Sequence, residues 1–87
     1  MENQTIISCQ ISFYPLNTKK VNEQVKKVIN LIKDSNLEYE SNSVSTIIYG
    51  RAEKIYSLLA EITKKMDEDK NEFSMSINIS NSCGCKI

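Results

Sequence analysis

The stretch Ile6-Ile-Ser-Cys-Gln-Ile-Ser-Phe-Tyr-Pro-Leu16 alternates strictly between apolar and polar side chains. Successive side chains of a β-strand point to opposite faces of its sheet, so this alternation predicts a strand with one apolar face. The apolar face carries Ile7, Cys9, Ile11 and Phe13, and the other carries Ser8, Gln10, Ser12 and Tyr14. The wet face of a half-buried strand usually carries charges, and this one has none. We therefore expect this face to meet a small polar ligand or another subunit.

Length and charge limit the class of protein. The 87 residues make one domain, and a chain of this size buries only about 60–65% of the surface that it exposes when unfolded. Eleven basic and eleven acidic side chains balance, so no overall field draws the chain to nucleic acid or to an anionic membrane. The N-terminus shows no secretory signal, and no stretch approaches the roughly 20 apolar residues of a membrane span. We expect a cytoplasmic protein with neither kind of partner.

The other elements follow from the spacing of their apolar residues. Steps of three and four residues predict helices over about 21–35 and 51–69. Alternation and β-branched residues predict strands over 37–41, 44–50 and 73–80. The order β-α-β-β-α-β favours an α+β ferredoxin-like sandwich, a four-stranded antiparallel sheet with both helices on one face. We place this domain at residues 1–80 and a flexible tail that contains cysteines at 81–87.

This topology leaves one face of the sheet without helices, here called the open face. The first strand would be central and the fourth would flank it, so their uncharged polar residues would form one surface. For the third strand two assignments stay open. If Thr46 and Ile48 face the helices, then Ser45, Ile47 and Tyr49 join the open face; a shift of one residue reverses this.

Metal binding, catalysis and RNA binding have weaker support. Cys83 and Cys85 could share a soft metal ion, but the chain has no histidine and Cys9 is predicted to lie in the core. Without histidine the commonest general base is absent, and no serine or cysteine has an obvious activating partner. Tyr14 and Tyr49 could stack on bases, but no basic patch surrounds them. We expect no metal, no cofactor and no enzymatic activity.

Four segments resemble the thiamine-binding protein family that includes the YkoF-type proteins. They are Ser8-Cys-Gln-Ile-Ser-Phe-Tyr-Pro-Leu16, Ser35-Asn-Leu-Glu-Tyr-Glu40, Val44-Ser-Thr-Ile-Ile-Tyr-Gly50 and Asn78-Ile-Ser80. The resemblance covers nearly the whole chain. It implies a ferredoxin-like fold, association through the sheets, and binding of thiamine or its hydroxymethylpyrimidine moiety during uptake or salvage, without enzymatic activity.

The resemblance also implies which residues bind the ligand. Carried over by position, they are Gln10, Ser12, Tyr14, Ser45 and Thr46, and more weakly Ser76 and Asn78. We expect them to hold the ligand at the open face or at a subunit interface of a homodimer or homotetramer. The alternative is a structural or regulatory module whose open face serves only for self-association.

Overall fold

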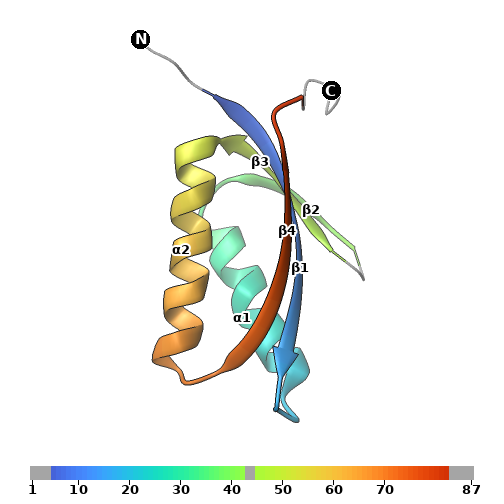
Figure 1. The fold of residues 1–87 in the computed structure, drawn as a ribbon, viewed down its shortest axis with the longest axis vertical. Helices are drawn as coiled ribbons and strands as arrows, with labels where there is room; N and C mark the ends of the chain where they lie inside the picture. Colours follow the sequence, from blue (N-terminus) through green and yellow to red (C-terminus); the bar gives the residue numbers. More distant parts are fainter. Residues whose placement is uncertain (1–4, 43–44, 83–87) are drawn as a thin grey trace.

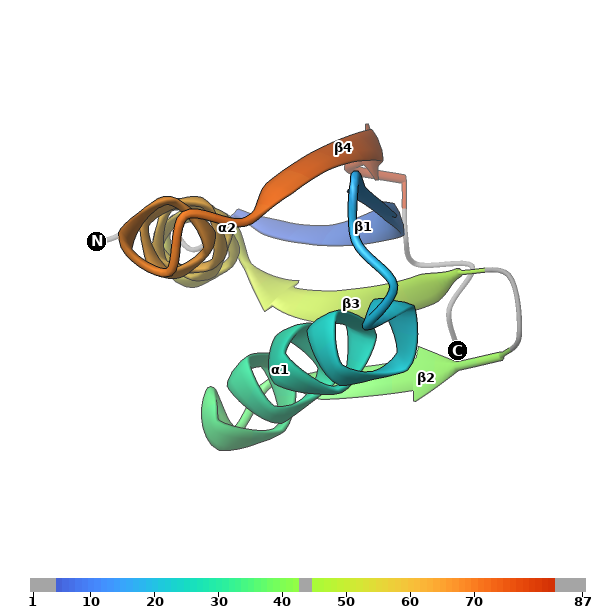
Figure 2. The ribbon, with the colours of Figure 1, turned by 90° about the horizontal axis from the view of Figure 1, so that it is seen from below.

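The computed structural model describes residues 5–42 and 45–82. Along the chain the elements are β1 (Ile6–Leu16), α1 (Val21–Asp34), β2 (Glu38–Ser41), β3 (Thr46–Arg51), α2 (Ala52–Glu68) and β4 (Glu72–Ser80). The four strands form one antiparallel sheet in the order β2-β3-β1-β4. Both helices lie on the same side of this sheet (Figures 1 and 2). The predicted ferredoxin-like α+β class is therefore confirmed.

The predicted elements differ from the observed ones mainly at their ends. Proline is expected to end a strand because it has no backbone N–H, yet the first strand continues past Pro15, which pairs with Phe73 of β4. The pairing of β1 with β3 ends at Ile11, so at Pro15 only β4 flanks the strand. Proline has no backbone N–H, and this costs no hydrogen bond on the side where β3 no longer runs. The helix α1 ends where Asn36 adopts a left-handed conformation with φ of 64°. Of the cysteine-containing tail, Cys83 and Cys85 lie outside the described residues.

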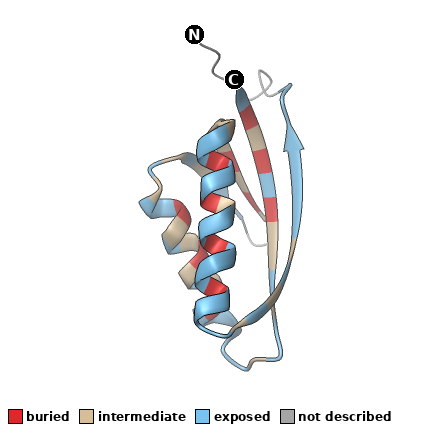
Figure 3. Cartoon of the chain, turned by 60° about the vertical axis from the view of Figure 1, so that its left-hand side comes forward, coloured by how far each residue is buried: buried red, intermediate tan, exposed pale blue. Residues whose placement is uncertain are grey.

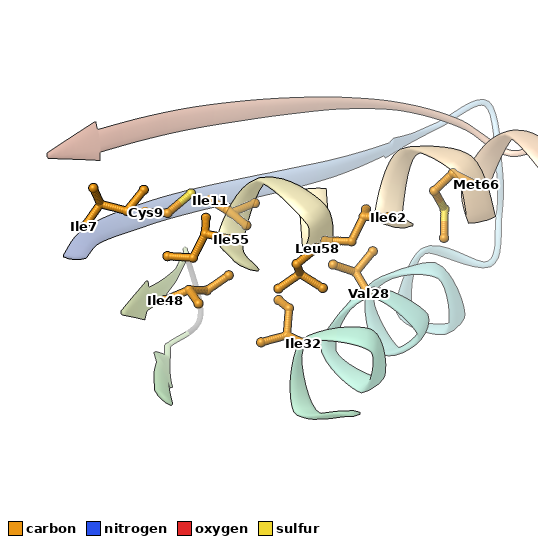
Figure 4. Packing of buried hydrophobic residues seen from close by; sticks show 10 residues of the cluster. All are labelled: Ile7, Cys9, Ile11, Val28, Ile32, Ile48, Ile55, Leu58, Ile62 and Met66. Carbon is orange, nitrogen blue, oxygen red and sulfur yellow. The ribbon is translucent and has the colours of Figure 1, made fainter. Parts of the chain in front are cut away.

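The core lies between the sheet and the two helices. Among the described residues it consists of ten buried apolar ones from β1, β3 and both helices: Ile7, Cys9, Ile11, Val28, Ile32, Ile48, Ile55, Leu58, Ile62 and Met66 (Figure 4). The alternation in β1 and the helical steps in α1 and α2 direct these side chains toward one another. Cys9 is completely buried, as predicted, and burial raises the pKa of its thiol.

Burial decides which residues of β3 face the helices. Thr46 is 7% exposed and Ile48 is completely buried, so both face the helices. Their neighbours Ser45, Ile47 and Tyr49 are half-buried and belong to the open face. Within the described residues, no helix is long and apolar enough to cross a membrane.

Candidate functional site

The register of β1 and β4 brings most of the predicted ligand-binding residues together on the open face. Gln10 lies opposite Asn78, and Ser12 lies opposite Ser76. These four residues and Ile77 line a shallow depression of about 330 Å³ that is wide open to solvent. The Gln10 side chain also donates a hydrogen bond from Nε2 to the Ser45 Oγ, at 3.1 Å. Tyr14, further along β1, is 49% exposed and does not line the depression.

The open face is uncharged only in its central part. The strand β2 lies beyond β3 and adds Glu38 opposite Tyr49 and Glu40 opposite Ile47. Residues opposite one another in an antiparallel pair share a face, so both glutamates project from the open face. Arg51 ends β3 and Glu72 begins β4, and the register places both on this face too. The uncharged region is therefore confined to the central parts of β3, β1 and β4.

Thr46 does not belong to this surface, although it was predicted to act with the open-face residues. It lies opposite Ile11 of β1, on the side of the sheet that the helices cover. Its Oγ1 is 3.0 Å from the Oγ of Ser41, across the hairpin formed by β2 and β3. The family resemblance groups this residue with those of the open face, yet it supplies a polar group on the helix side.

Thr46 lines a cavity of about 180 Å³ between α1 and the sheet. Its apolar wall comes from two residues of β1 and four of α1: Ile11, Phe13, Val25, Val28, Ile29 and Ile32. Its polar residues all come from the β2–β3 hairpin: Ser41, Asn42, Ser45 and Thr46. The hairpin is held by two bonds between Asn42 and Ser45, in which the Asn42 amide donates to the Ser45 carbonyl and the Ser45 amide donates to Asn42 Oδ1, both at 2.9 Å.

The cavity has the size and lining for one uncharged ring. An apolar cavity of about 150 Å³ holds a benzene molecule, so about 180 Å³ admits a six-membered ring with a small substituent. Hydroxyl and amide groups at one end can pair with ring nitrogens or an exocyclic amino group, while the apolar wall covers the ring faces. No charged side chain is among the described residues that line it. This lining fits a neutral heteroaromatic ring better than a phosphate.

Two contributors to this cavity could not be found from the sequence pattern. Ser41 and Asn42 occupy the end of an edge strand and the following turn, where polar residues are ordinary. Only the pairing of Ser41 with Thr46 across the hairpin shows that both hydroxyls reach the helix side. The spacing of Val25, Val28 and Ile32 predicts an apolar helix face, but not that space remains beneath it.

No curated protein matches the chain. Among solved structures, a Thermotoga maritima protein provisionally described as a thiamine biosynthesis or salvage protein has a TM-score of 0.77 and 19% identity, over 86% of this chain and 82% of its own. A hypothetical protein of Methanocaldococcus jannascii has a TM-score of 0.76 and 25% identity, over 87% and 79%. A Bacillus cereus domain of unknown function, DUF77, has a TM-score of 0.78 and 22% identity, over 91% and 80%.

These structures share the fold, and a family model adds the relationship in sequence. The model of the YKOF-related family matches residues 6–86, which include all six elements of the fold. The resemblance drawn from the strand motifs is thereby confirmed. The protein belongs to the YkoF-related family.

Proposed function

We propose that this protein binds thiamine or its hydroxymethylpyrimidine moiety without carrying out chemistry on it. The ring of the pyrimidine lies in the cavity beneath α1, and the hydroxyls of Ser41 and Thr46 lie at its polar end. The observation that carries this proposal is the pairing of a ring-sized apolar cavity with hydrogen-bonding groups on one wall. The protein's family and its structural likeness to a provisional thiamine salvage protein support the choice of ligand.

The chemistry of the aminopyrimidine suits this lining. Its ring nitrogens accept hydrogen bonds and its amino group donates them, all in the plane of the ring, and a hydroxyl can do either. A single buried hydrogen bond contributes about 0.5–1.5 kcal/mol net, so micromolar affinity requires several of them together with burial of the ring. The described lining of the cavity contains no basic side chain, which favours unphosphorylated ligands over thiamine phosphates.

The open face has a different role in this proposal, which is association with a second copy of the chain. The polar groups at its centre can remain in contact with water at little cost. Exposure is unfavourable for the apolar side chains among them, such as Ile47, which lies between Gln10 and Glu40. A homodimer or a homotetramer would cover this surface and turn the shallow depression at Gln10 into an enclosed space. The second candidate function, a self-association module without a ligand, rests on this surface alone.

The test is isothermal titration calorimetry of the purified protein with thiamine and with hydroxymethylpyrimidine, accompanied by light scattering on the same sample. Saturable binding of both compounds is expected. Oxythiamine, in which an oxygen replaces the ring amino group, is the matched control ligand and should bind more weakly, because a donor becomes an acceptor. An oligomer that binds none of the three compounds would leave the self-association module as the better account.

A further inference from the structure

The buried stripe of α1 begins with a polar residue. The buried residues of this helix are Gln24, Val28 and Ile32, spaced by four, and Gln24 is only 6% exposed. An apolar side chain at this position would need no hydrogen bonds, as is true of Val28 and Ile32. Glutamine instead brings a carboxamide, and its Oε1 is buried without a hydrogen bond from any described residue. The first turns of α1 therefore hold a polar group that the fold leaves unsatisfied.

A second unsatisfied group belongs to the connection between α2 and β4. The Nδ2 of Asn71 is buried and donates no hydrogen bond to any described residue. Over residues 5–42 and 45–82, only three buried side-chain nitrogens or oxygens lack a partner. Two of the three belong to Gln24 and Asn71, whose side chains line one cavity of about 160 Å³. Folded proteins satisfy the large majority of such groups, so two in one place indicate a missing partner.

This second cavity lies where the β1–α1 and α2–β4 connections come together, at the lower end of the molecule in Figures 1 and 3. Seven described residues line it: Leu16, Asn17, Thr18, Gln24, Lys70, Asn71 and Glu72. It is more enclosed than the depression on the open face. None of these residues also lines the cavity beneath α1, so the second cavity is independent of the site proposed for the pyrimidine.

Hydrogen bonds hold the frame of the second cavity. Asn17 and Lys70 both adopt left-handed conformations, with φ of 53° and 60°, which turn the chain after β1 and after α2. Asn17 donates a hydrogen bond from Nδ2 to the Oε1 of Glu72, at 2.5 Å. The backbone amide of Asn71 donates to the carbonyl of Met66, at 2.9 Å. The frame is thus bonded to itself, and the two unsatisfied carboxamide atoms are left for a ligand.

We propose that the second cavity binds a small primary carboxamide through a pair of hydrogen bonds. A primary carboxamide carries an N–H donor and a carbonyl acceptor side by side in one plane. Its N–H donates to Gln24 Oε1 and its carbonyl accepts from Asn71 Nδ2, which satisfies both groups. A carboxylate could not do this, because it has no donor.

The charge and the size of the second cavity agree with this ligand. Its two charged residues, Lys70 and Glu72, have opposite signs, so the lining suits a neutral molecule better than an anion or a cation. A cavity of about 150 Å³ holds benzene, so about 160 Å³ admits a carboxamide no larger than a single ring. Acetamide, the simplest stable example of this class, is therefore a suitable probe.

The first test is an NMR titration of the ¹⁵N-labelled full chain with acetamide, because side-chain carboxamides give their own N–H signals. The signals of Gln24 and Asn71 should shift and saturate together, whereas that of the exposed Asn22 on α1 should not move. N,N-dimethylacetamide lacks the N–H donor and should bind about ten-fold more weakly. Shifts that never saturate, or equal affinity for both compounds, would overturn the proposal and leave ordered water as the partner of the two groups.

Substitutions check that the same two groups carry the binding. Gln24→Met keeps the length of the side chain and removes its carboxamide, so acetamide affinity should fall about ten-fold. Asn71→Ala should have the same effect from the opposite wall, and it provides the test if the first variant does not fold. Asn22→Leu, two residues from Gln24, is the matched control and should bind as the wild type does. Circular dichroism identifies the folded variants, and unchanged affinity in a folded Gln24→Met or Asn71→Ala protein contradicts the proposal.

Discussion

The two sides of the sheet carry similar hydrogen-bonding groups in very different surroundings. On the open face, Gln10, Ser12 and Asn78 line a depression that is wide open to solvent. On the helix side, Ser41 and Thr46 meet an apolar wall within a smaller cavity. A hydrogen bond to a ligand replaces one to water in the first case, but is strengthened by low polarity and accompanied by ring burial in the second. This greater enclosure, rather than the number of polar groups, is the reason that we propose the helix-side cavity as the ligand site.

The largest expected difference between the two sides is in stability. Ile47 and Ile48 are adjacent in β3, but Ile48 is completely buried on the helix side whereas Ile47 lies on the open face. Ile48→Ala should lower the free energy of unfolding by about 2–5 kcal/mol. Ile47→Ala should lower it by less than half as much. This holds in dilute protein, where two copies would no longer associate through the open face. Urea unfolding followed by circular dichroism compares them. Equal losses that persist on dilution would contradict this contrast.

The next largest effect concerns occupancy of the cavity. Val25→Phe adds a ring to the apolar wall, and that ring and a pyrimidine cannot both occupy about 180 Å³. Affinity for hydroxymethylpyrimidine should fall by about two orders of magnitude, which corresponds to roughly 2.7 kcal/mol. Calorimetry measures the loss. Val21→Phe, one turn earlier on α1 and exposed, should bind as the wild type does. Unchanged affinity in Val25→Phe would remove the ligand from the cavity.

A smaller change separates the two candidate ligand positions. Thr46→Val keeps the shape of the side chain and removes its hydroxyl, so affinity should fall by between about two-fold and about ten-fold, the equivalent of one hydrogen bond. Ser12→Ala on the open face should change affinity by less than that. Titration of both variants with the same ligand decides between them. The reverse result would place the ligand on the open face, among the residues that the family resemblance implied.

The smallest effect comes from Cys9. Burial raises the pKa of its thiol, so the folded chain keeps this proton to a higher pH than the unfolded chain does. Above the ordinary thiol pKa of about 8.5 the unfolded chain binds fewer protons, and the free energy of unfolding falls as pH rises. Two proteins are compared: Cys83→Ser/Cys85→Ser, and the same protein with Cys9→Ala added. The urea midpoint should fall more between pH 7.5 and pH 10 in the first than in the second. Parallel pH dependences would show that the folded thiol titrates normally.

The sequence predicts the fold well where one side of an element is clearly apolar. The strict alternation in β1 identifies the buried side of that strand, including Cys9, because a strand allows only two directions for its side chains. In β3 the same rule is ambiguous, since Ile47 and Ile48 are adjacent and both apolar. In β4 the alternation gives the correct face for Ile77 and Ile79 but not their exposure. That exposure depends on how the helices pack across the sheet, which the sequence of β4 alone does not determine.

The candidate site is predicted less completely than the fold. Pairing of β1 with β4 follows from the topology, and it brings Gln10, Ser12, Ser76 and Asn78 together as expected. The cavity does not follow from any single element, because it is the space left between α1 and a hairpin that is distant in the sequence. The contact between the hydroxyls of Thr46 and Ser41, on the covered side of the sheet, therefore does not follow from the sequence alone.

Ser45 belongs to both sides of the sheet at once. It is among the residues that line the cavity, yet its hydroxyl accepts the hydrogen bond of Gln10 on the open face. A ligand that shifts the hairpin would also shift Gln10, and a second copy that binds over Gln10 would in turn act on the cavity. Thermodynamic linkage makes such an influence reciprocal, so each event would change the affinity of the other by the same factor. A vitamin-binding chain with this arrangement would report ligand concentration through its own assembly.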